Sequence, residues 1–154
     1  MSDPIIRPAR ADEYDEIGRV WMESWVSTGL DEASNFLLAN LRARIRKEIE
    51  DGWSLYVADD NGTIAAMLAL HLPKRYLDML FVGPEYQGRS VGRQLLAFTR
   101  TQLPDEIWLR CVRENEKAWR WYEREGFVFE QEDISPVTGF TMKCYRWKRQ
   151  TSAV

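Results

Sequence analysis

The sequence predicts an α/β (α+β) fold, in which a mixed central sheet of about seven strands is flanked by about four helices. Strand-like and helix-like segments alternate along the chain. Asn61-Gly62 stands between two apolar runs, as the turn of a β-hairpin does. Residues 77–82 are almost wholly apolar, which is typical of a central strand covered on both faces. No internal repeat or linker-like tract interrupts the 154 residues, so we expect one domain over 1–154.

Two amphipathic segments after a short strand at 5–7 predict the first two helices. Asp12 can cap the first helix, and Gly29 breaks it. Its apolar residues recur every three or four positions, which puts them on one face: Tyr14, Ile17, Trp21 and Trp25. The second helix carries four apolar residues on one face, namely Leu38, Leu41, Ile45 and Ile49, and Gly52 is its expected C-terminal glycine.

The remaining segments complete the order β-α-α-β-β-β-α-β-α-β-β. Val91, Leu95 and Phe98 mark a third helix that ends before Pro104. A fourth helix runs from Asn115 to Glu125, where Gly126 stops it. The other expected strands are 53–59, 63–71, 77–82, 107–111, 127–131 and 140–147.

The composition is that of an ordinary globular protein and argues against several classes of function. The net charge is −3 without a basic tract, so we expect no nucleic-acid partner. No apolar run is long enough to span a bilayer, and the N-terminal residues contain no apolar signal segment, so we expect a cytoplasmic protein. Cys111 and Cys144 are interpreted as reduced core thiols, and the lone histidine, His71, gives no reason to expect a metal.

The segment Gln87-Gly88-Arg89-Ser90-Val91-Gly92, between a buried strand and an amphipathic helix, is the sharpest functional motif. Glycines let backbone N–H groups turn toward a ligand, and a helix N-terminus adds unpaired donors and a positive dipole end. Such a segment suits a pyrophosphate, and Arg89 and Arg93 can add charge-assisted bonds. The alternative is a glycine-rich turn without a ligand.

A second motif lies on the predicted fourth helix. Asn115, Ala118 and Tyr122 are three and four residues apart and therefore share a face. The small residue between two polar ones leaves room for a ligand. A tyrosine hydroxyl, with a pKa near ~10, can protonate a departing thiolate. The alternative is a core tyrosine whose hydroxyl is hydrogen-bonded.

Together the two motifs resemble those of the GCN5-related N-acetyltransferases. That family has Gln/Arg-x-x-Gly-x-Gly/Ala after a central strand, and here Gln87 to Gly92 follow Leu77 to Val82. The family's Asn-x-x-Ala-x-x-x-Tyr-x-x-x-Gly-Phe is matched from Asn115 to Phe127. Ser90 departs from the pattern, because it occupies the first signature glycine. A positive φ there would strain it by roughly 1 kcal/mol.

The resemblance implies a mostly antiparallel sheet and direct transfer of an acetyl group from acetyl-CoA to a primary amine of a small molecule or peptide. It implies no metal, and it allows a homodimer. The central strand would splay from its neighbouring strand after Leu109, and backbone N–H groups near Leu80 and Phe81 would hold the thioester carbonyl. Tyr122 would be the general acid. The expected cofactor-binding residues are Leu80, Phe81, Val82, Gln87, Gly88, Arg89, Ser90, Val91, Gly92, Arg93, Asn115, Ala118 and Tyr122. The alternative function is a non-catalytic acyl-CoA-binding sensor or interaction module.

Further residues are candidates for the acceptor side. Asp78 is a lone charge in an apolar strand, where a carboxylate is costly unless it is paired or functional. Simple alternation would place it on the same face as Leu80, one pleat away, so it could bind the acceptor and act as base through a water. The alternative is a salt bridge to Arg75 or another arginine. Trp21 and Trp25 could form an acceptor pocket or pack in the core, as their helical spacing favours.

Overall fold

The computed structural model describes residues 3–30, 38–136 and 138–150. Its strands are β1 (Ile5–Pro8), β2 (Ser54–Asp60), β3 (Thr63–His71), β4 (Tyr76–Val82), β5 (Glu106–Val112), β6 (Val128–Ile134) and β7 (Thr141–Lys148). Its α-helices are α1 (Tyr14–Val26), α2 (Leu38–Glu50), α3 (Val91–Gln102) and α4 (Glu116–Arg124). The predicted fold class and the order of elements are therefore confirmed.

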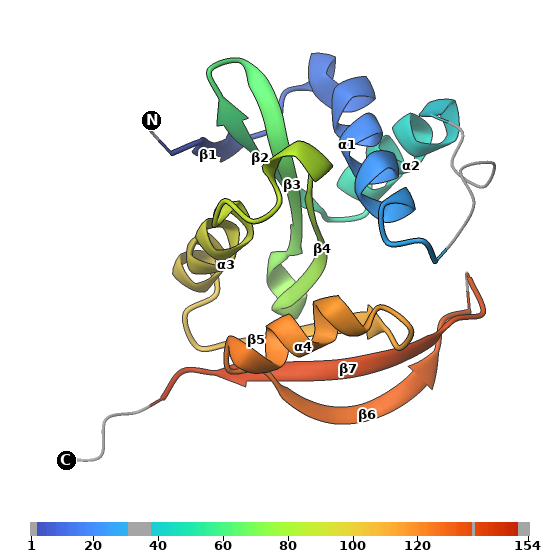
Figure 1. Ribbon diagram of the computed structural model, residues 1–154, viewed down its shortest axis with the longest axis vertical. Coiled ribbons are helices and arrows are strands. Elements are labelled where there is room, and N and C mark those ends of the chain that lie inside the picture. Colours follow the sequence, from blue (N-terminus) through green and yellow to red (C-terminus); the bar gives the residue numbers. More distant parts are fainter. Residues whose placement is uncertain (1–2, 31–37, 137, 151–154) are drawn as a thin grey trace.

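The seven strands form one sheet in the order β1-β2-β3-β4-β5-β7-β6. All neighbouring strands are antiparallel except β4 and β5, which are parallel. α1 and α2 lie together on one side of the sheet, and α3 lies on the other (Figure 1). The mixed sheet with helices on both faces is the arrangement that the alternating sequence pattern predicts.

The β2–β3 hairpin shows how local sequence determines local structure. Asn61 and Gly62 both have positive φ, 52° and 96°, which is the backbone of a type I′ turn. Asp59 Oδ1 accepts a hydrogen bond of 2.7 Å from the Gly62 N–H and closes the turn. Gly52 likewise ends α2, with a φ of 122° and a bond from its N–H to Ile49 O. Both turn predictions are confirmed.

The start of α1 differs from the prediction. Asp12 lies in a short 3₁₀ turn, Ala11–Glu13, and α1 begins at Tyr14 without a side-chain cap. Glu13 organises this corner instead: its Oε1 accepts a bond of 2.8 Å from the Arg10 N–H, and its Oε2 pairs with Arg7 at 2.6 Å. The buried Glu13 carboxylate, which binds the Arg10 backbone N–H and the Arg7 side chain of β1, is therefore favoured over a cap by the exposed Asp12.

Two apolar cores lie on the two faces of the sheet. The core under α1 and α2 contains Ile17, Trp21 and Ile45 from the predicted helical stripes. The core under α3 and α4 contains Leu95 and Tyr145, both fully buried. Cys111 and Cys144 are buried and free, as expected of reduced core thiols. Within the described ranges, no helix is both long enough and apolar enough to cross a membrane.

Candidate active site

The parallel strands β4 and β5 part in the middle of the sheet. They pair only at Tyr76 with Trp108 and at Leu77 with Leu109. Beyond that point β4 continues alongside β3, where Val82 is still paired, and β5 continues alongside β7. The predicted divergence after Leu109 is confirmed, and it leaves the β5-facing edge of the second half of β4 open to a ligand.

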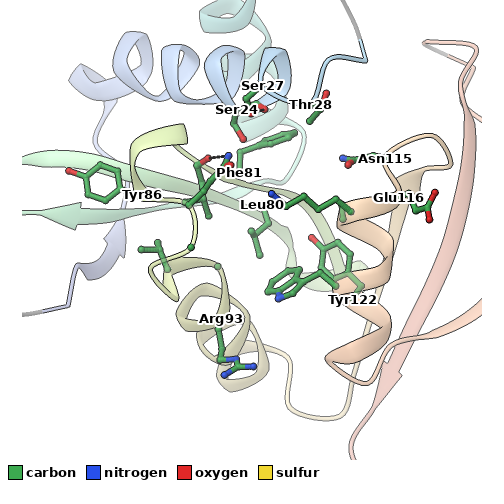
Figure 2. Close-up of a pocket in the computed structure, with 18 of the residues that line it drawn as sticks. Ser24, Ser27, Thr28, Leu80, Phe81, Tyr86, Arg93, Asn115, Glu116 and Tyr122 are labelled. Atoms are coloured by element: carbon green, nitrogen blue, oxygen red, sulfur yellow. Dashed lines mark hydrogen bonds between the residues drawn. The ribbon is translucent and has the colours of Figure 1, made fainter.

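A cleft of about 740 Å³ extends from this opening to the start of α3 and to α4. Figure 2 shows side chains of β4, α4 and the C-terminal end of α1 around it, with Arg93 at the start of α3 extending away from its centre. Twelve of the predicted cofactor residues line it: Leu80, Phe81, Val82, Gln87, Gly88, Ser90, Val91, Gly92, Arg93, Asn115, Ala118 and Tyr122. Arg89 does not line it; its guanidinium lies over the Tyr86 ring, 5.7 Å from the ring centroid.

The loop before α3 has the backbone that an anion site requires. Gly88 and Ser90 have positive φ values of 80° and 67°, and α3 begins directly afterwards at Val91. Gln87 Nε2 donates a hydrogen bond of 3.1 Å to Val82 O, which ties the loop to the end of β4. The helix N-terminus therefore faces the cleft with its N–H groups and its positive dipole end. Ser90 carries the left-handed strain anticipated for a non-glycine residue.

The motif on α4 meets the cleft from the opposite wall. Asn115 is the N-cap residue of α4, and its carbonyl accepts the N–H of Ala118 at 3.1 Å. Tyr122 is only 8% exposed, yet its hydroxyl points toward the cleft (Figure 2). Burial raises the pKa of this hydroxyl above its ordinary value near 10, so it stays protonated at neutral pH. The group is available as a proton donor, not as a base.

A second cavity of about 840 Å³ adjoins the first and also reaches Leu109 to Val112 of β5. It shares five residues with the first cleft: Leu80, Phe81, Asn115, Ala118 and Tyr122. Four of its further lining residues are aromatic: Trp21 and Trp25 from α1, Tyr76 from β4, and Phe140. Two ligands, one in each compartment, would meet beside Tyr122 and the Leu80–Phe81 backbone. Such an arrangement suits group transfer between a donor and an acceptor.

Asp78 lies at a β-bulge, which changes the face it occupies. Opposite Leu70 and Ala69 of β3, the pairing jumps from Leu77 to Met79 and skips Asp78. Leu77 and Leu80 therefore pack in the core under α3 and α4, whereas Met79 packs in the core under α1 and α2. The expectation that Asp78 shares a face with Leu80 is wrong, because simple alternation does not cross a bulge.

The surroundings of Asp78 also differ from the predicted structural alternative. Arg75 pairs with Glu106 at 3.2 Å, and no described arginine pairs with Asp78. Asp78 Oδ2 instead accepts a hydrogen bond of 2.7 Å from Trp53 Nε1. The residue still lines the second cavity, together with Trp25, another predicted acceptor-side residue. His71 lies elsewhere, with its Nε2 3.2 Å from Asp51 O.

Several lining residues carried no recognisable signal in the sequence. Ser24, Ser27 and Thr28 reach the first cleft because α1 ends there, and Trp121 flanks Gly92 from α4. These contacts depend on how helices pack across the sheet, which helical spacing alone does not reveal. Among the residues that the structure describes, no cluster of three or more histidine, cysteine or acidic side chains could hold a metal ion.

Comparisons with known proteins agree with this geometry. Residues 14–127 match the model of the acetyltransferase (GNAT) family. The peptidyl-lysine N-acetyltransferase YjaB of Escherichia coli is 28% identical over 127 residues, covering 79% of this chain and 80% of YjaB. An acetyltransferase structure from Thermus thermophilus superposes with a TM-score of 0.78 at 18% identity, covering 94% and 96% of the two chains. The PaiA N-acetyltransferase of Thermoplasma acidophilum, solved with coenzyme A, gives 0.73 at 20% identity, covering 96% and 99%.

Proposed function

The chain belongs to the acetyltransferase (GNAT) family, and we propose that its acetyl transfer takes place where the two compartments meet beside Tyr122. It is an acetyl-CoA-dependent N-acetyltransferase that moves the acetyl group to an amine. The single observation behind the proposal is that Tyr122, Asn115 and the Leu80–Phe81 backbone border both compartments at once.

The first cleft is the proposed site of acetyl-CoA. The pyrophosphate would bind the Gly88–Gly92 backbone at the N-terminus of α3, where N–H donors and the helix dipole favour an anion. The pantetheine arm would run between Val82 and Ala118, and the Asn115 side chain would hydrogen-bond to it. Arg93 also lines this cleft, but its guanidinium is paired with the Glu125 carboxylate at 3.4 Å. Arg93 would therefore contact the phosphates only at the edge of the site.

The chemistry proposed at the junction is direct attack without a covalent enzyme intermediate. The amine nitrogen forms a bond to the acetyl carbon while the backbone N–H groups near Leu80 and Phe81 stabilise the developing oxyanion. The carbon–sulfur bond then breaks, and Tyr122 gives its proton to the departing thiolate. Asp78, acting through a water, takes the proton that the acceptor must lose before it attacks.

The proposed acceptor is a primary amine, and the second cavity is its site. Its aromatic walls suit an alkyl chain, and Asp78 supplies a carboxylate for a cationic nitrogen. A lysine side chain of a peptide has both features. The similarity to YjaB and to YiaC of Escherichia coli, both named peptidyl-lysine N-acetyltransferases, supports this choice.

A homodimer is a further part of the proposal. β6 is an edge strand of the sheet, and it carries Val128 and Ile134 at 67% and 68% exposure. Apolar side chains on an open strand edge favour association with another chain. Light scattering of the purified protein should give twice the mass of one chain; the mass of one chain would argue against a dimer.

The activity is tested by supplying acetyl-CoA with a lysine-containing peptide and a panel of small primary amines. Thiol release should depend on the amine and should match an N-acetyl product found by mass spectrometry in equal amount. Acetyl-CoA binding without amine-dependent thiol release, for every acceptor offered, would favour the alternative of a non-catalytic acyl-CoA-binding module.

A further inference from the structure

The charges that line the second cavity are unequally compensated. Both arginines that line it have acidic partners: Arg110 pairs with Asp133, and Arg44 Nε lies 3.9 Å from Glu48 Oε1. The Arg44 guanidinium also lies over the Trp21 ring. Asp78 has no ion-pair partner among the described residues. A half-buried carboxylate without a cation is costly, so the cavity is suited to a ligand that brings one.

The Trp53 indole holds this carboxylate from the protein interior. Trp53 is 4% exposed and packs in the core under α1 and α2, with its ring 6.2 Å from that of Trp21. Its Nε1–H donates to Asp78 Oδ2 at 2.7 Å, a short bond for a nitrogen donor. Trp53 does not line the second cavity, whereas Asp78 does. The indole therefore binds one carboxylate oxygen from behind and leaves the carboxylate accessible from the cavity side.

The β-bulge brings these two side chains together. The pairing between β3 and β4 skips Asp78, so its side chain turns toward the face of the sheet that α1 and α2 cover. Trp53, the residue directly before β2, packs on that same face. The charge of Asp78 also reaches Tyr76 in the cavity wall: burial, and after it the Asp78 carboxylate, raise the pKa of the Tyr76 hydroxyl. Asp78 thus stands between a buried donor and the cavity.

We propose that Trp53 is a positioning residue, which orients the Asp78 carboxylate to receive the acceptor's ammonium group and take a proton from it. This inference rests on the proposed function. The ammonium gives one proton to Asp78 through water, and its nitrogen then forms the bond to the acetyl carbon. As the carbon–sulfur bond breaks, Tyr122 protonates the thiolate. The tetrahedral intermediate loses a second N–H proton, which passes through water to the Tyr122 phenolate and restores the hydroxyl, and Asp78 releases its own proton to solvent.

A double-mutant cycle on turnover tests the positioning role. The variants are Trp53→Phe, which keeps a ring but loses the N–H donor, Asp78→Asn, and the pair together. Trp53→Phe should lower kcat about tenfold in the wild-type background, and less than about twofold when Asp78→Asn is already present. The KM for acetyl-CoA should stay unchanged in all three. Trp119→Phe is the matched control, because Trp119 Nε1 donates a bond of 2.8 Å to Arg113 O outside both compartments.

Measuring turnover with acceptor amines of different basicity separates loss of positioning from loss of packing. The defect of Trp53→Phe should be large with a strongly basic alkylamine and should nearly vanish with an amine that is already neutral at the assay pH. An equal loss in both backgrounds, a loss independent of amine basicity, or a loss matched by Trp119→Phe would overturn the positioning role. Each of these outcomes is read against an active wild-type enzyme, so it differs from the absence of turnover that would refute the proposed function.

Discussion

Tyr122 is the residue on which both compartments converge, and its hydroxyl is the proposed proton donor. Tyr122→Phe removes the donor and keeps the buried ring, so kcat should fall by about 10²-fold or more with little change in the affinity for acetyl-CoA. Steady-state kinetics and calorimetry measure the two quantities. Turnover at the wild-type rate would make Tyr122 a core residue and assign the proton to water.

The protonation state of Tyr122 also predicts how the rate depends on pH. Burial raises the pKa of the Tyr122 hydroxyl above its ordinary value near 10, so the acid form persists through the usual assay range. The rate should therefore show no alkaline loss from tyrosine ionisation below about pH 10. A fall in kcat that begins near neutral pH, and that Tyr122→Phe abolishes, would contradict this protonation state.

Ser90 is strained by its left-handed backbone, with a φ of 67°. Ser90→Gly relieves about 1–2 kcal/mol of strain and costs about 0.4–1 kcal/mol through the freer unfolded chain. The net expectation is a stabilisation of roughly 0.5–1 kcal/mol, measured by denaturant unfolding. Ser90→Ala is the control, because it removes the hydroxyl and keeps the strain. If Ser90→Gly is less stable than Ser90→Ala, which also lacks the hydroxyl, the freer unfolded chain outweighs the relief of backbone strain.

At the scale of elements, the N-terminus of α3 is the proposed phosphate site. A Cβ at Gly92 would lie 3.6 Å from the Trp121 ring and 3.8 Å from Val82 Cγ2, which is ordinary contact. Gly92→Ala should therefore bind acetyl-CoA almost normally. Gly92→Leu should weaken binding by at least about tenfold, or ~1.4 kcal/mol, because its branches enter the cleft. Calorimetry measures both, and unchanged affinity in the leucine variant would argue against this part of the site.

The sequence predicted part of the structure of β4 but not the bulge within it. Its apolar run and the loop after it were recognisable, because both depend on neighbouring residues. The bulge at Asp78 was not, since it arises from the pairing of β4 with β3, which no local pattern encodes. The Trp53–Asp78 bond joins residues 25 positions apart and was hidden for the same reason. Long-range pairing therefore decided which face the carboxylate occupies.

At the scale of the whole molecule, the opening between β4 and β5 is where the two proposed ligand compartments meet. Only two residue pairs join these strands, and both compartments border β4 beyond the point where they part. The order of elements and the divergence were predictable, the first from sequence periodicity and the second from the family resemblance. Asp78 and Trp25 were predicted on the acceptor side, but the extent of the second cavity was not, because its walls come from α1, α2, β4, β5, α4 and the β6–β7 connection.

A crystal structure with bound acetyl-CoA tests the central claim most directly, namely that the cofactor lies in the first cleft and presents its acetyl group to the second cavity. The account predicts the pyrophosphate at Gly88–Gly92 and the thioester oxygen within hydrogen-bonding distance of the backbone N–H near Leu80 or Phe81. The sulfur should lie beside the Tyr122 hydroxyl, with the acetyl group facing Asp78 and Trp25. A cofactor bound elsewhere, or an acetyl group directed away from the second cavity, would contradict the account.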